Sequence, residues 1–276
     1  MIIPTFLREA VVTRKSCDHL FGTILYPALK RVRIQSTKTY NGGLFIADFQ
    51  AMPWGCGVWP AYWSCGPNWP NAGKHLSRLS YSKHLSIYSG EIDIVEGVNL
   101  GSFNQYTLHS APDSTCTLTN AGLEVLGSVM GGKMGVTCAS SESADAGCAY
   151  QDTNATSFGS GFNAANGGVF AHLWDSTGVT MWHFTRSEIP ADIKAKKPNP
   201  AGWSTPVGYW SSDSCDIKSY FYEHTLTLDT TICGGWATSS YPSSCPGKTC
   251  TSIVANATNF INAKWMINYI AVYQSD

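Results

Sequence analysis

KWMINYIAVYQ, at residues 264–274, is the stretch that decides the fold class. On an extended strand, alternate residues point to opposite faces. Here every odd-numbered residue from Trp265 to Tyr273 is apolar or aromatic, and on the other face only Asn268 is polar between 266 and 272. A strand that is apolar on both faces is typical of the interior of a two-sheet sandwich.

The rest of the chain has the same strand-and-turn texture. Short alternating or apolar runs are separated by Gly, Pro, Asn and Ser, and helical periodicity is nearly absent. The turn sequence DSTG at 175–178 joins two such runs and predicts a hairpin. Many short strands without an alternating strand–helix rhythm predict an all-β fold, a β-sandwich or jelly roll. The expected strands lie within residues 31–36, 42–49, 167–174, 178–184, 221–228 and 264–274.

The composition excludes several classes of function. Of 276 residues only 13% are charged, and the net charge is −1. An electrostatic grip on nucleic acid or an anionic membrane needs a clear basic excess, so neither partner is expected. No run of 18 apolar residues exists, which excludes a transmembrane helix. Few charges and ten tryptophans fit a neutral, flat-faced ligand such as a sugar, although a tryptophan-rich core would give the same count.

The cysteines and sequons indicate an oxidising compartment. Ten cysteines show no zinc-site spacing, so disulfides are expected, with pairings that the sequence cannot assign. Asn154 and Asn256 each begin an N-glycosylation sequon. The first fifteen residues, in contrast, lack the apolar core of a signal peptide.

The densest cluster of acids is GEIDIVEG, residues 90–97. On a regular strand Glu91 and Asp93 share a face and Glu96 points the other way. One β-bulge between Asp93 and Glu96 would bring all three carboxyls to one face and leave the other face apolar. Neighbouring carboxyls should raise at least one pKa. Such a pair suits glycoside hydrolysis, while a solvated strand face or a Ca²⁺ cluster remain alternatives.

Aromatic and polar residues flank this cluster. Trp59 and Trp63 share a strand face in GCGVWPAYWSCGPNWPN, residues 55–71, and with Trp69 in the following loop they could form a platform for pyranose rings or simply pack in the core. In NQYTLHS, residues 104–110, period-2 spacing places Gln105 and His109 on one face. That face would bind substrate hydroxyls or be the outer face of an edge strand.

These motifs together resemble glycoside hydrolase family 16, and most closely the fungal laminarinase-like endo-β-1,3(4)-glucanases. The resemblance runs from about 31 to 273 and includes WPAYW, EIDIVEG, NQYTLH and CGGWA. It implies a concanavalin A-like β-sandwich jelly roll with a concave substrate cleft and hydrolysis with retention. Glu91 would be the nucleophile, Glu96 the general acid/base, and Asp93 the residue that tunes the nucleophile.

The same resemblance implies how sugar is bound. Trp59, Trp63 and Trp236 would line sugar subsites, Gln105 would meet substrate hydroxyls, and His109 would lie beside the acid/base. The expected partner is a β-glucan polysaccharide or oligosaccharide. The family implies an extracellular monomer without a redox or organic cofactor, and no metal-ligand set is recognised, although some relatives hold a structural Ca²⁺.

Two segments depart from the family pattern. Residues 1–30 do not match, which suggests a misassigned start, and the remainder, 31–276, is expected to form a single hydrolase domain. That domain is interrupted by 74–90, seventeen residues that we interpret as a retained intron or an inserted loop. Nine cysteines remain in the matching portion, so one thiol would be free or would have lost its partner. A glucan transglycosylase, or a non-catalytic glucan-binding or defective product, therefore remain alternatives.

Overall fold

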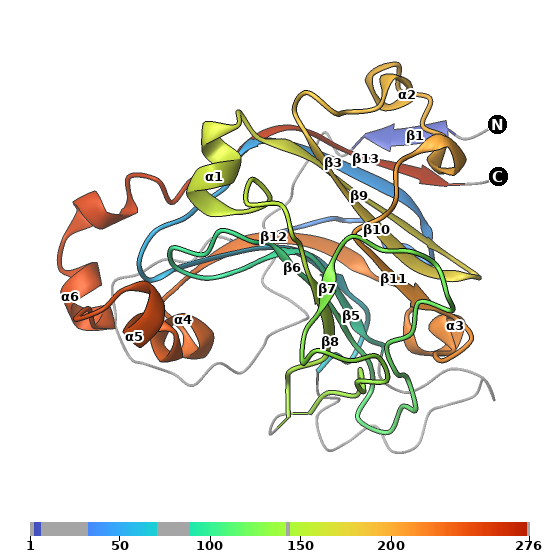
Figure 1. Ribbon diagram of the computed structural model, residues 1–276, viewed down its shortest axis with the longest axis horizontal. Helices are drawn as coiled ribbons and strands as arrows, with labels where there is room; N and C mark the ends of the chain where they lie inside the picture. The colour runs from blue at the N-terminus through green and yellow to red at the C-terminus, as the bar shows by residue number, and fades with distance from the viewer. Residues whose placement is uncertain (1–2, 7–32, 71–88, 142–143, 275–276) are drawn as a thin grey trace.

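The chain folds into a sandwich of two antiparallel β-sheets, as the computed structural model shows (Figure 1). The structure describes residues 3–6, 33–70, 89–141 and 144–274. Within these ranges one sheet has the strand order β1-β13-β3-β9-β10-β11 and the other has the order β2-β12-β4-β5-β6-β8-β7. The all-β sandwich predicted from the sequence is confirmed.

The strand bounds follow the expected runs closely. The hairpin at 175–178 is confirmed, because β9 and β10 pair from Gly178 opposite Asp175, and Asp175 accepts a hydrogen bond from the Thr177 amide at 2.8 Å. The strand expected from 221 begins only at Thr225, since helix α3 precedes it. The strands are β1 (Ile3–Phe6), β2 (Arg33–Gln35), β3 (Gly43–Ala51), β4 (Val58–Cys65), β5 (Glu91–Glu96), β6 (Gln105–His109), β7 (Ser128–Val129), β8 (Cys148–Gln151), β9 (Gly168–Asp175), β10 (Gly178–Thr185), β11 (Gly208–Ser211), β12 (Thr225–Ile232) and β13 (Met266–Gln274).

The main core lies between the two sheets. The first sheet contributes Phe45, Phe49 and Phe170, and the second contributes Tyr62 and Tyr106, all of them almost completely buried. Large aromatic side chains bury much apolar surface, so this layer supplies a large share of the hydrophobic stabilisation. The packing leaves the outer face of the second sheet available for a cleft.

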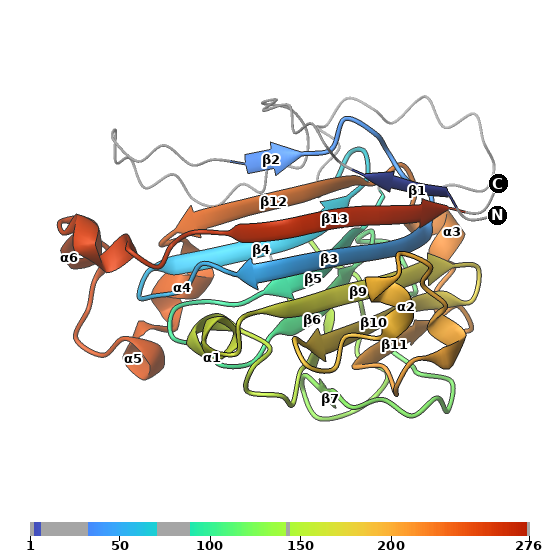
Figure 2. The same ribbon diagram turned by 90° about the horizontal axis from the view of Figure 1, so that it is seen from above.

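Strand β13 differs from its expectation in one half. Ala271, Val272 and Tyr273 are buried, but Met266 and Ile267 are 47% and 43% exposed. The physical reason is pairing: β1 covers only the end of β13 (Figure 2), and the register with β3 is irregular before Tyr269. The prediction that this strand is buried on both faces is therefore wrong for its first half.

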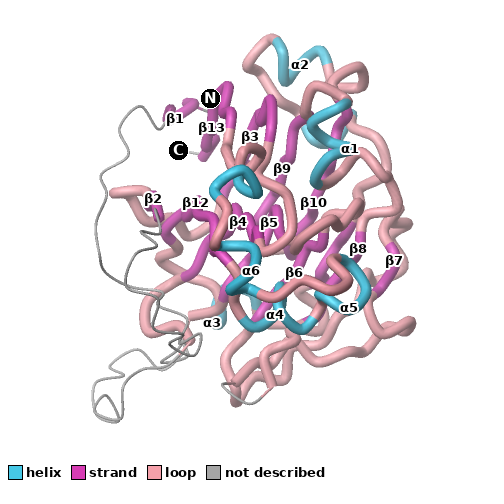
Figure 3. The backbone as a smooth tube through the Cα atoms, turned by 90° about the vertical axis from the view of Figure 1, so that its left-hand side faces the viewer, coloured by secondary structure: helices cyan, strands magenta, loops and turns pink. Residues whose placement is uncertain are grey.

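Short helices and disulfides complete the fold. Helices α4, α5 and α6 gather at one end of the sandwich (Figure 3), where Cys56–Cys245 joins the end of α5 to the loop before β4 and Cys233–Cys250 joins α6 to the end of β12. Two further disulfides are Cys116–Cys215 and Cys138–Cys148. The helical segments are α1 (Gly159–Ala164), α2 (Ala191–Lys194), η1 (Pro200–Gly202), α3 (Ile217–Tyr220), α4 (Gly235–Ser239), α5 (Tyr241–Ser244), α6 (Cys250–Val254) and η2 (Ala257–Phe260).

The disulfide expectation is confirmed across the described residues. Cys65 is disulfide-bonded as well, so no cysteine in this part of the chain is free, whereas Cys17 lies outside the described residues. Both sequon asparagines accept hydrogen bonds from the amide and hydroxyl of the threonine two residues later, and Asn256 is exposed. No helix within the described residues has the length and hydrophobicity needed to cross a membrane.

Most of the two departing segments lies outside the described residues, and of 74–90 only the last two residues are described. Residues 71–88 are not described; Ser89 and Gly90 are. The Ser89 amide donates to the Pro67 carbonyl at 3.2 Å, and the Gly66 amide donates to the Gly90 carbonyl at 3.2 Å. The Ser89 hydroxyl also bonds the backbone of Tyr222. Because Ser89 and Gly90 pair with Gly66 and Pro67, we expect that removing 74–90 would let Ala72-Gly73 take the place of Ser89-Gly90.

Deletion of 74–90 is therefore expected to leave a folded chain with β5 in its register. The loss of the Ser89 hydroxyl contacts should lower the free energy of unfolding by about 1–3 kcal/mol. Urea unfolding followed by tryptophan fluorescence measures this change. Ser89→Ala in the full chain is the matched control and should show a similar loss. A deletion variant that does not fold, beside a folded Ser89→Ala variant, would show that the segment is integral to the domain.

Two histidines are enclosed in the core in neutral form. His172 stacks on Phe45 with ring centroids 4.3 Å apart, and neither of its ring nitrogens has a hydrogen-bond partner. His224 shares a hydrogen bond with the Ser64 hydroxyl at 2.9 Å. Burial lowers the pKa of both imidazoles to about 3. The folded chain therefore resists protonation that the unfolded chain accepts.

This burial predicts acid sensitivity. As the pH falls below about 6.5, the unfolded chain binds protons that the folded chain excludes, so stability should fall by roughly 3 kcal/mol per histidine between pH 7 and pH 4. His172→Phe should reduce that loss, because one such group is removed. Urea unfolding of both chains at pH 7 and pH 4 measures the difference. An equal pH dependence in the two chains would contradict the neutral, buried state of His172.

Candidate active site

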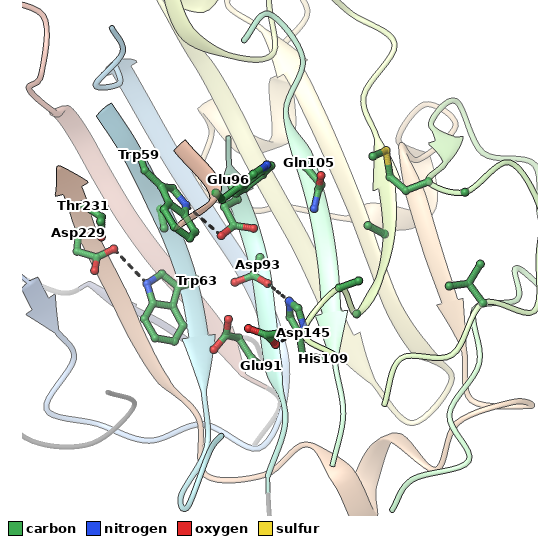
Figure 4. Close-up of a pocket in the computed structure, with 18 of the residues that line it drawn as sticks. Trp59, Trp63, Glu91, Asp93, Glu96, Gln105, His109, Asp145, Asp229 and Thr231 are labelled. Carbon is green, nitrogen blue, oxygen red and sulfur yellow. Dashed lines mark hydrogen bonds and ion pairs between the residues drawn. The ribbon is translucent and has the colours of Figure 1, made fainter. Parts of the chain in front are cut away.

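A register break in β5 brings three carboxyls to one face. Asp93 lies opposite Thr107 and Glu96 opposite Gln105, so the pairing with β6 shifts between Asp93 and Glu96. Glu91, Asp93 and Glu96 all line one cleft of about 610 Å³ on the outer face of the second sheet (Figure 4). The bulge predicted from residue parity is confirmed. The intervening residues Ile92, Ile94 and Val95 are fully buried in the core.

Asn104 holds this bulge. Its side-chain oxygen accepts from the Glu96 amide at 3.0 Å, and its side-chain nitrogen donates to the Ile94 carbonyl at 2.8 Å. Asn104 is itself fully buried. The amide side chain thus satisfies backbone groups that the irregular pairing would leave unbonded. Sequence reasoning missed this residue, because nothing in the pattern around it distinguishes it from an ordinary loop asparagine.

Glu91 is almost completely buried beside an indole. The Trp69 ring nitrogen donates to its Oε2 at 2.6 Å, and both residues are less than 5% exposed. A hydrogen bond of this kind favours the ionised carboxylate and fixes its orientation. The sequence placed Trp69 among residues of a sugar platform. The structure instead gives it a direct contact with a carboxylate.

The pKa of Asp93 is strongly perturbed. Burial raises its pKa well above the ordinary value, and the charges of Glu91 and Glu96 and a hydrogen bond with Glu91 raise it further. Its Oδ2 lies 3.3 Å from His109 Nε2. The expectation that at least one pKa in the cluster rises is confirmed at Asp93. A protonated Asp93 can donate its hydrogen bond to Glu91 at neutral pH.

Glu96 is the least buried of the three acids. Its Oε1 accepts from the Trp59 ring nitrogen at 3.1 Å. Trp59 in turn meets Trp236 edge to face, with ring centroids 5.4 Å apart. Trp236, at the start of α4, closes this side of the cleft.

The next tryptophan along β4 is held by charged neighbours. Asp229 of β12 accepts from the Trp63 ring nitrogen at 3.3 Å and from Arg33 Nε at 3.2 Å. The Arg33 guanidinium lies over the indole, 5.1 Å from the ring centroid. All three residues line the cleft. Sequence reasoning missed Arg33, which lies in an expected run, and Asp229, which directly follows one, because no spacing links them to the acidic cluster.

Gln105 and His109 line the opposite wall, on the face that the period-2 spacing predicted. The Gln105 side chain donates to the hydroxyl of buried Thr107 at 3.0 Å. His109 Nδ1 is 2.8 Å from the Ser140 hydroxyl and 3.5 Å from the Asp145 carboxylate. The cleft therefore has a floor of carboxyls between an indole wall and a polar wall.

A metal ion is the other ligand that these groups could hold. Glu91, Asp93 and His109 each offer a ligand atom, and these atoms lie within 4.8 Å of one another. Metal ligation needs a deprotonated carboxylate, which the raised pKa of Asp93 opposes. The sequence-based expectation of no metal here stays a prediction.

Comparison with known proteins agrees with this geometry. The family model for the XgeA-like catalytic domain of glycoside hydrolase family 16 matches residues 20–74 and 82–273. The chain belongs to glycoside hydrolase family 16. The gap in the match, 75–81, lies inside the segment 74–90 that the sequence marked as extra, but the match covers 82–90 and also 20–30, which the sequence had placed outside the family pattern. The resemblance stated from EIDIVEG and its neighbours is thereby confirmed, and the chain contains a glycoside hydrolase domain.

Individual family members extend the comparison. The chain is 40% identical to a probable glycosidase of Schizosaccharomyces pombe, with 88% of this chain and 54% of the relative covered. It is 35% identical to an endo-1,3(4)-β-glucanase of Arthroderma benhamiae, covering 88% and 50%. The chain thus spans about half the length of these curated relatives.

Solved family 16 structures share the fold. Laminarinase 16A from Phanerochaete chrysosporium, solved with 6-O-glucosyl-laminaritriose in donor and acceptor sites, has a TM-score of 0.75 and 32% identity, covering 88% of this chain and 76% of that one. An elongating family 16 β-1,3-glucosyltransferase has a TM-score of 0.73 and 36% identity, with the same coverage. The jelly-roll expectation is confirmed by these matches.

Asp93→Asn is expected to increase the stability of the fold at pH 7 and to lower the enzymatic activity. Because the folded chain raises the pKa of Asp93, the carboxyl keeps a proton that the unfolded chain releases above about pH 4. The wild-type residue therefore destabilises the fold increasingly as the pH rises toward 7. The asparagine variant should unfold at higher urea concentration at pH 7, while its glycoside hydrolase activity falls by about tenfold or more.

The comparison is made between the two chains at pH 4.5 and pH 7.5, which cancels the contribution of the buried histidines. The gain in stability should be larger at pH 7.5. A variant less stable than wild type at pH 7.5 would show that Asp93 is ionised in the folded protein.

Proposed function

We propose that this chain is a retaining endo-glycosidase that hydrolyses β-1,3(4)-glucan by double displacement. The observation that carries the proposal is the convergence of Glu91, Asp93 and Glu96 on one cleft floor beneath two indoles. Retaining glycosidases need two carboxyls close together, one ionised and one protonated. The bulge supplies the shared face, and the unequal burial of the acids supplies different environments.

Glu91 acts as the nucleophile. The hydrogen bond from Trp69 and the hydrogen bond with Asp93 hold its carboxylate oriented toward the cleft. It attacks the anomeric carbon and forms a covalent glycosyl-enzyme. Asp93, protonated, stabilises the charge on Glu91 before the attack and can adjust its hydrogen bond as that charge disappears.

Glu96 acts as the general acid and then as the general base. In the first step it donates a proton to the leaving glycosidic oxygen, and in the second step it takes a proton from the water that attacks the glycosyl-enzyme. Its greater exposure suits both roles, since the leaving group departs and water enters on this side. The Trp59 ring nitrogen donates to one of its oxygens and orients the carboxyl group.

The substrate class follows from the walls of the cleft and from the relatives. Indole side chains suit neutral pyranose rings, and the similar laminarinase was solved with glucan oligosaccharides. The relative from Arthroderma benhamiae is named as an endo-1,3(4)-β-glucanase. Four described disulfides and two sequons support secretion, and we propose an extracellular monomer acting on cell-wall or storage glucan.

Glu91→Gln and Glu96→Gln should each lower laminarin hydrolysis by about 10³-fold or more, because each removes one half of the acid–nucleophile pair. Reducing-sugar release from laminarin and lichenan measures the loss. Glu124→Gln, at an exposed position outside the cleft, is the control and should keep full activity.

Alanine variants with added azide separate the two roles. Azide should rescue Glu96→Ala by attacking the glycosyl-enzyme and give the β-glycosyl azide. In Glu91→Ala azide should replace the nucleophile and give the α-glycosyl azide. Proton NMR of the products distinguishes them, and the reverse pattern would exchange the assigned roles.

A second candidate is glucan transglycosylation, which the similarity to an elongating β-1,3-glucosyltransferase favours. The chemistry is shared up to the glycosyl-enzyme, after which a sugar hydroxyl replaces water. Chromatography of products from laminarihexaose decides between them: products longer than the substrate indicate transfer, and only shorter ones indicate hydrolysis. A non-catalytic or defective chain would give neither.

A further inference from the structure

One more acid reaches the cleft from the wall opposite the indoles. Asp145 lines the cleft, and its side chain is 40% exposed (Figure 4). We propose that Asp145 is a sugar-binding residue whose carboxylate accepts hydrogen bonds from hydroxyls of a neutral glucan. This inference rests on the proposed function, since it names a further contact of the same site.

The loop that carries Asp145 is closed at both ends. Cys138 and Cys148, which flank it, are joined by a disulfide and are both buried. The Ser110 amide at the end of β6 donates to the Cys138 carbonyl at 2.8 Å, and the Ser140 amide donates back to Ser110 at 3.1 Å. Because the chain is tethered on both sides of Asp145, this residue loses little entropy when a ligand binds.

Gly147 sets how closely the loop approaches the catalytic strands. Its φ is +60°, and a Cβ at this position would lie 2.7 Å from both His109 Nδ1 and the Leu108 carbonyl. Only glycine fits there without strain. The backbone at Gly147 therefore lies directly against His109. Asp145, two residues earlier, lies beside the same histidine and lines the cleft together with the three carboxyls.

Holding His109 does not explain Asp145. The Ser140 hydroxyl already bonds His109 Nδ1 at 2.8 Å, whereas the Asp145 oxygen is 3.5 Å away, at the limit of a hydrogen bond. A carboxylate that served only to orient the imidazole would be expected closer and more buried. The Asp145 side chain is instead partly exposed and lines the cleft, where a sugar would lie.

The chemistry of this wall favours a hydroxyl-rich, uncharged ligand. Beyond Gln105 and His109, the neighbouring lining residues Met130, Val136 and Ala149 offer no strong side-chain hydrogen-bond acceptor to the cleft. A carboxylate can accept from two adjacent sugar hydroxyls at once. Together with Glu91 and Glu96 it would also repel anionic sugars such as uronic acids.

Binding to an inactive chain tests the proposal without the catalytic step. Laminarihexaose is titrated by calorimetry into Glu91→Gln, Glu91→Gln/Asp145→Ala and Glu91→Gln/Asp145→Asn. The alanine variant should raise Kd about tenfold or more, and the asparagine variant, which keeps one acceptor oxygen, should raise it less. Glu91→Gln/Asp113→Ala, at an exposed acid outside the cleft lining, is the matched control and should bind unchanged.

Replacing Cys138 and Cys148 by serine in the Glu91→Gln chain tests the tether. That variant should also weaken laminarihexaose binding, since the loop is no longer fixed beside His109.

The outcomes separate this inference from the proposed function. If Glu91→Gln binds laminarihexaose and the Asp145→Ala variant binds it equally well, the role of Asp145 is wrong and the proposed function stands. If wild type neither cleaves nor elongates laminarihexaose and Glu91→Gln does not bind it, both fail. Unchanged thermal unfolding in the Asp145 variants ensures that a weaker Kd reports a lost contact.

Discussion

The backbone bulge between Asp93 and Glu96 is the constraint on which the rest of the site depends. A strand has a period of two, so it cannot place Glu91, Asp93 and Glu96 on one face while Ile92, Ile94 and Val95 fill the core, unless its register shifts once. Asn104 makes the shift tolerable by bonding the Glu96 amide and the Ile94 carbonyl. Catalytic geometry and core packing are therefore satisfied by the same irregularity, and losing it would disturb both.

Three neighbouring and largely buried carboxyls are costly to ionise, and the surrounding side chains reduce this cost. Burial and the charges of Glu91 and Glu96 oppose ionisation of Asp93 and raise its pKa, so the site does not hold three buried charges. Indole N–H groups stabilise the other two: Trp69 donates to Glu91 and Trp59 donates to Glu96. Indoles suit this position because they donate hydrogen bonds without adding a positive charge.

Some features of the site could be predicted from the sequence because they depend on neighbouring residues, whereas others depend on contacts that the local sequence does not reveal. The bulge could be predicted because it depends on the parity of six consecutive residues, and Gln105 and His109 could be placed because β6 is a regular strand. Arg33 and Asp229 could not, since they act through contacts between strands far apart in the sequence. Asn104 could not either, because nothing in the pattern around it distinguishes it from an ordinary loop asparagine. The first half of β13 shows the opposite limit: its apolar pattern is correct, but burial depends on which neighbours cover Met266 and Ile267, and a single strand does not carry that information.

The two walls of the cleft are built from different elements, one from a central strand and the other largely from loops. This difference affects which wall can change without moving the three carboxyls. Trp59 and Trp63 project from β4 in the middle of the sheet, where changing them would disturb hydrogen bonds to Glu96 and Asp229. The opposite wall comes from loops between β6 and β8 that are fixed by a disulfide and by the fit of Gly147 against His109. Substitutions in such a loop can alter the contacts offered to a sugar without changing the strand register that positions the carboxyls. Differences in sugar preference or acceptor use between related domains should therefore arise mainly on this wall, while the floor and the indole wall retain the common reaction.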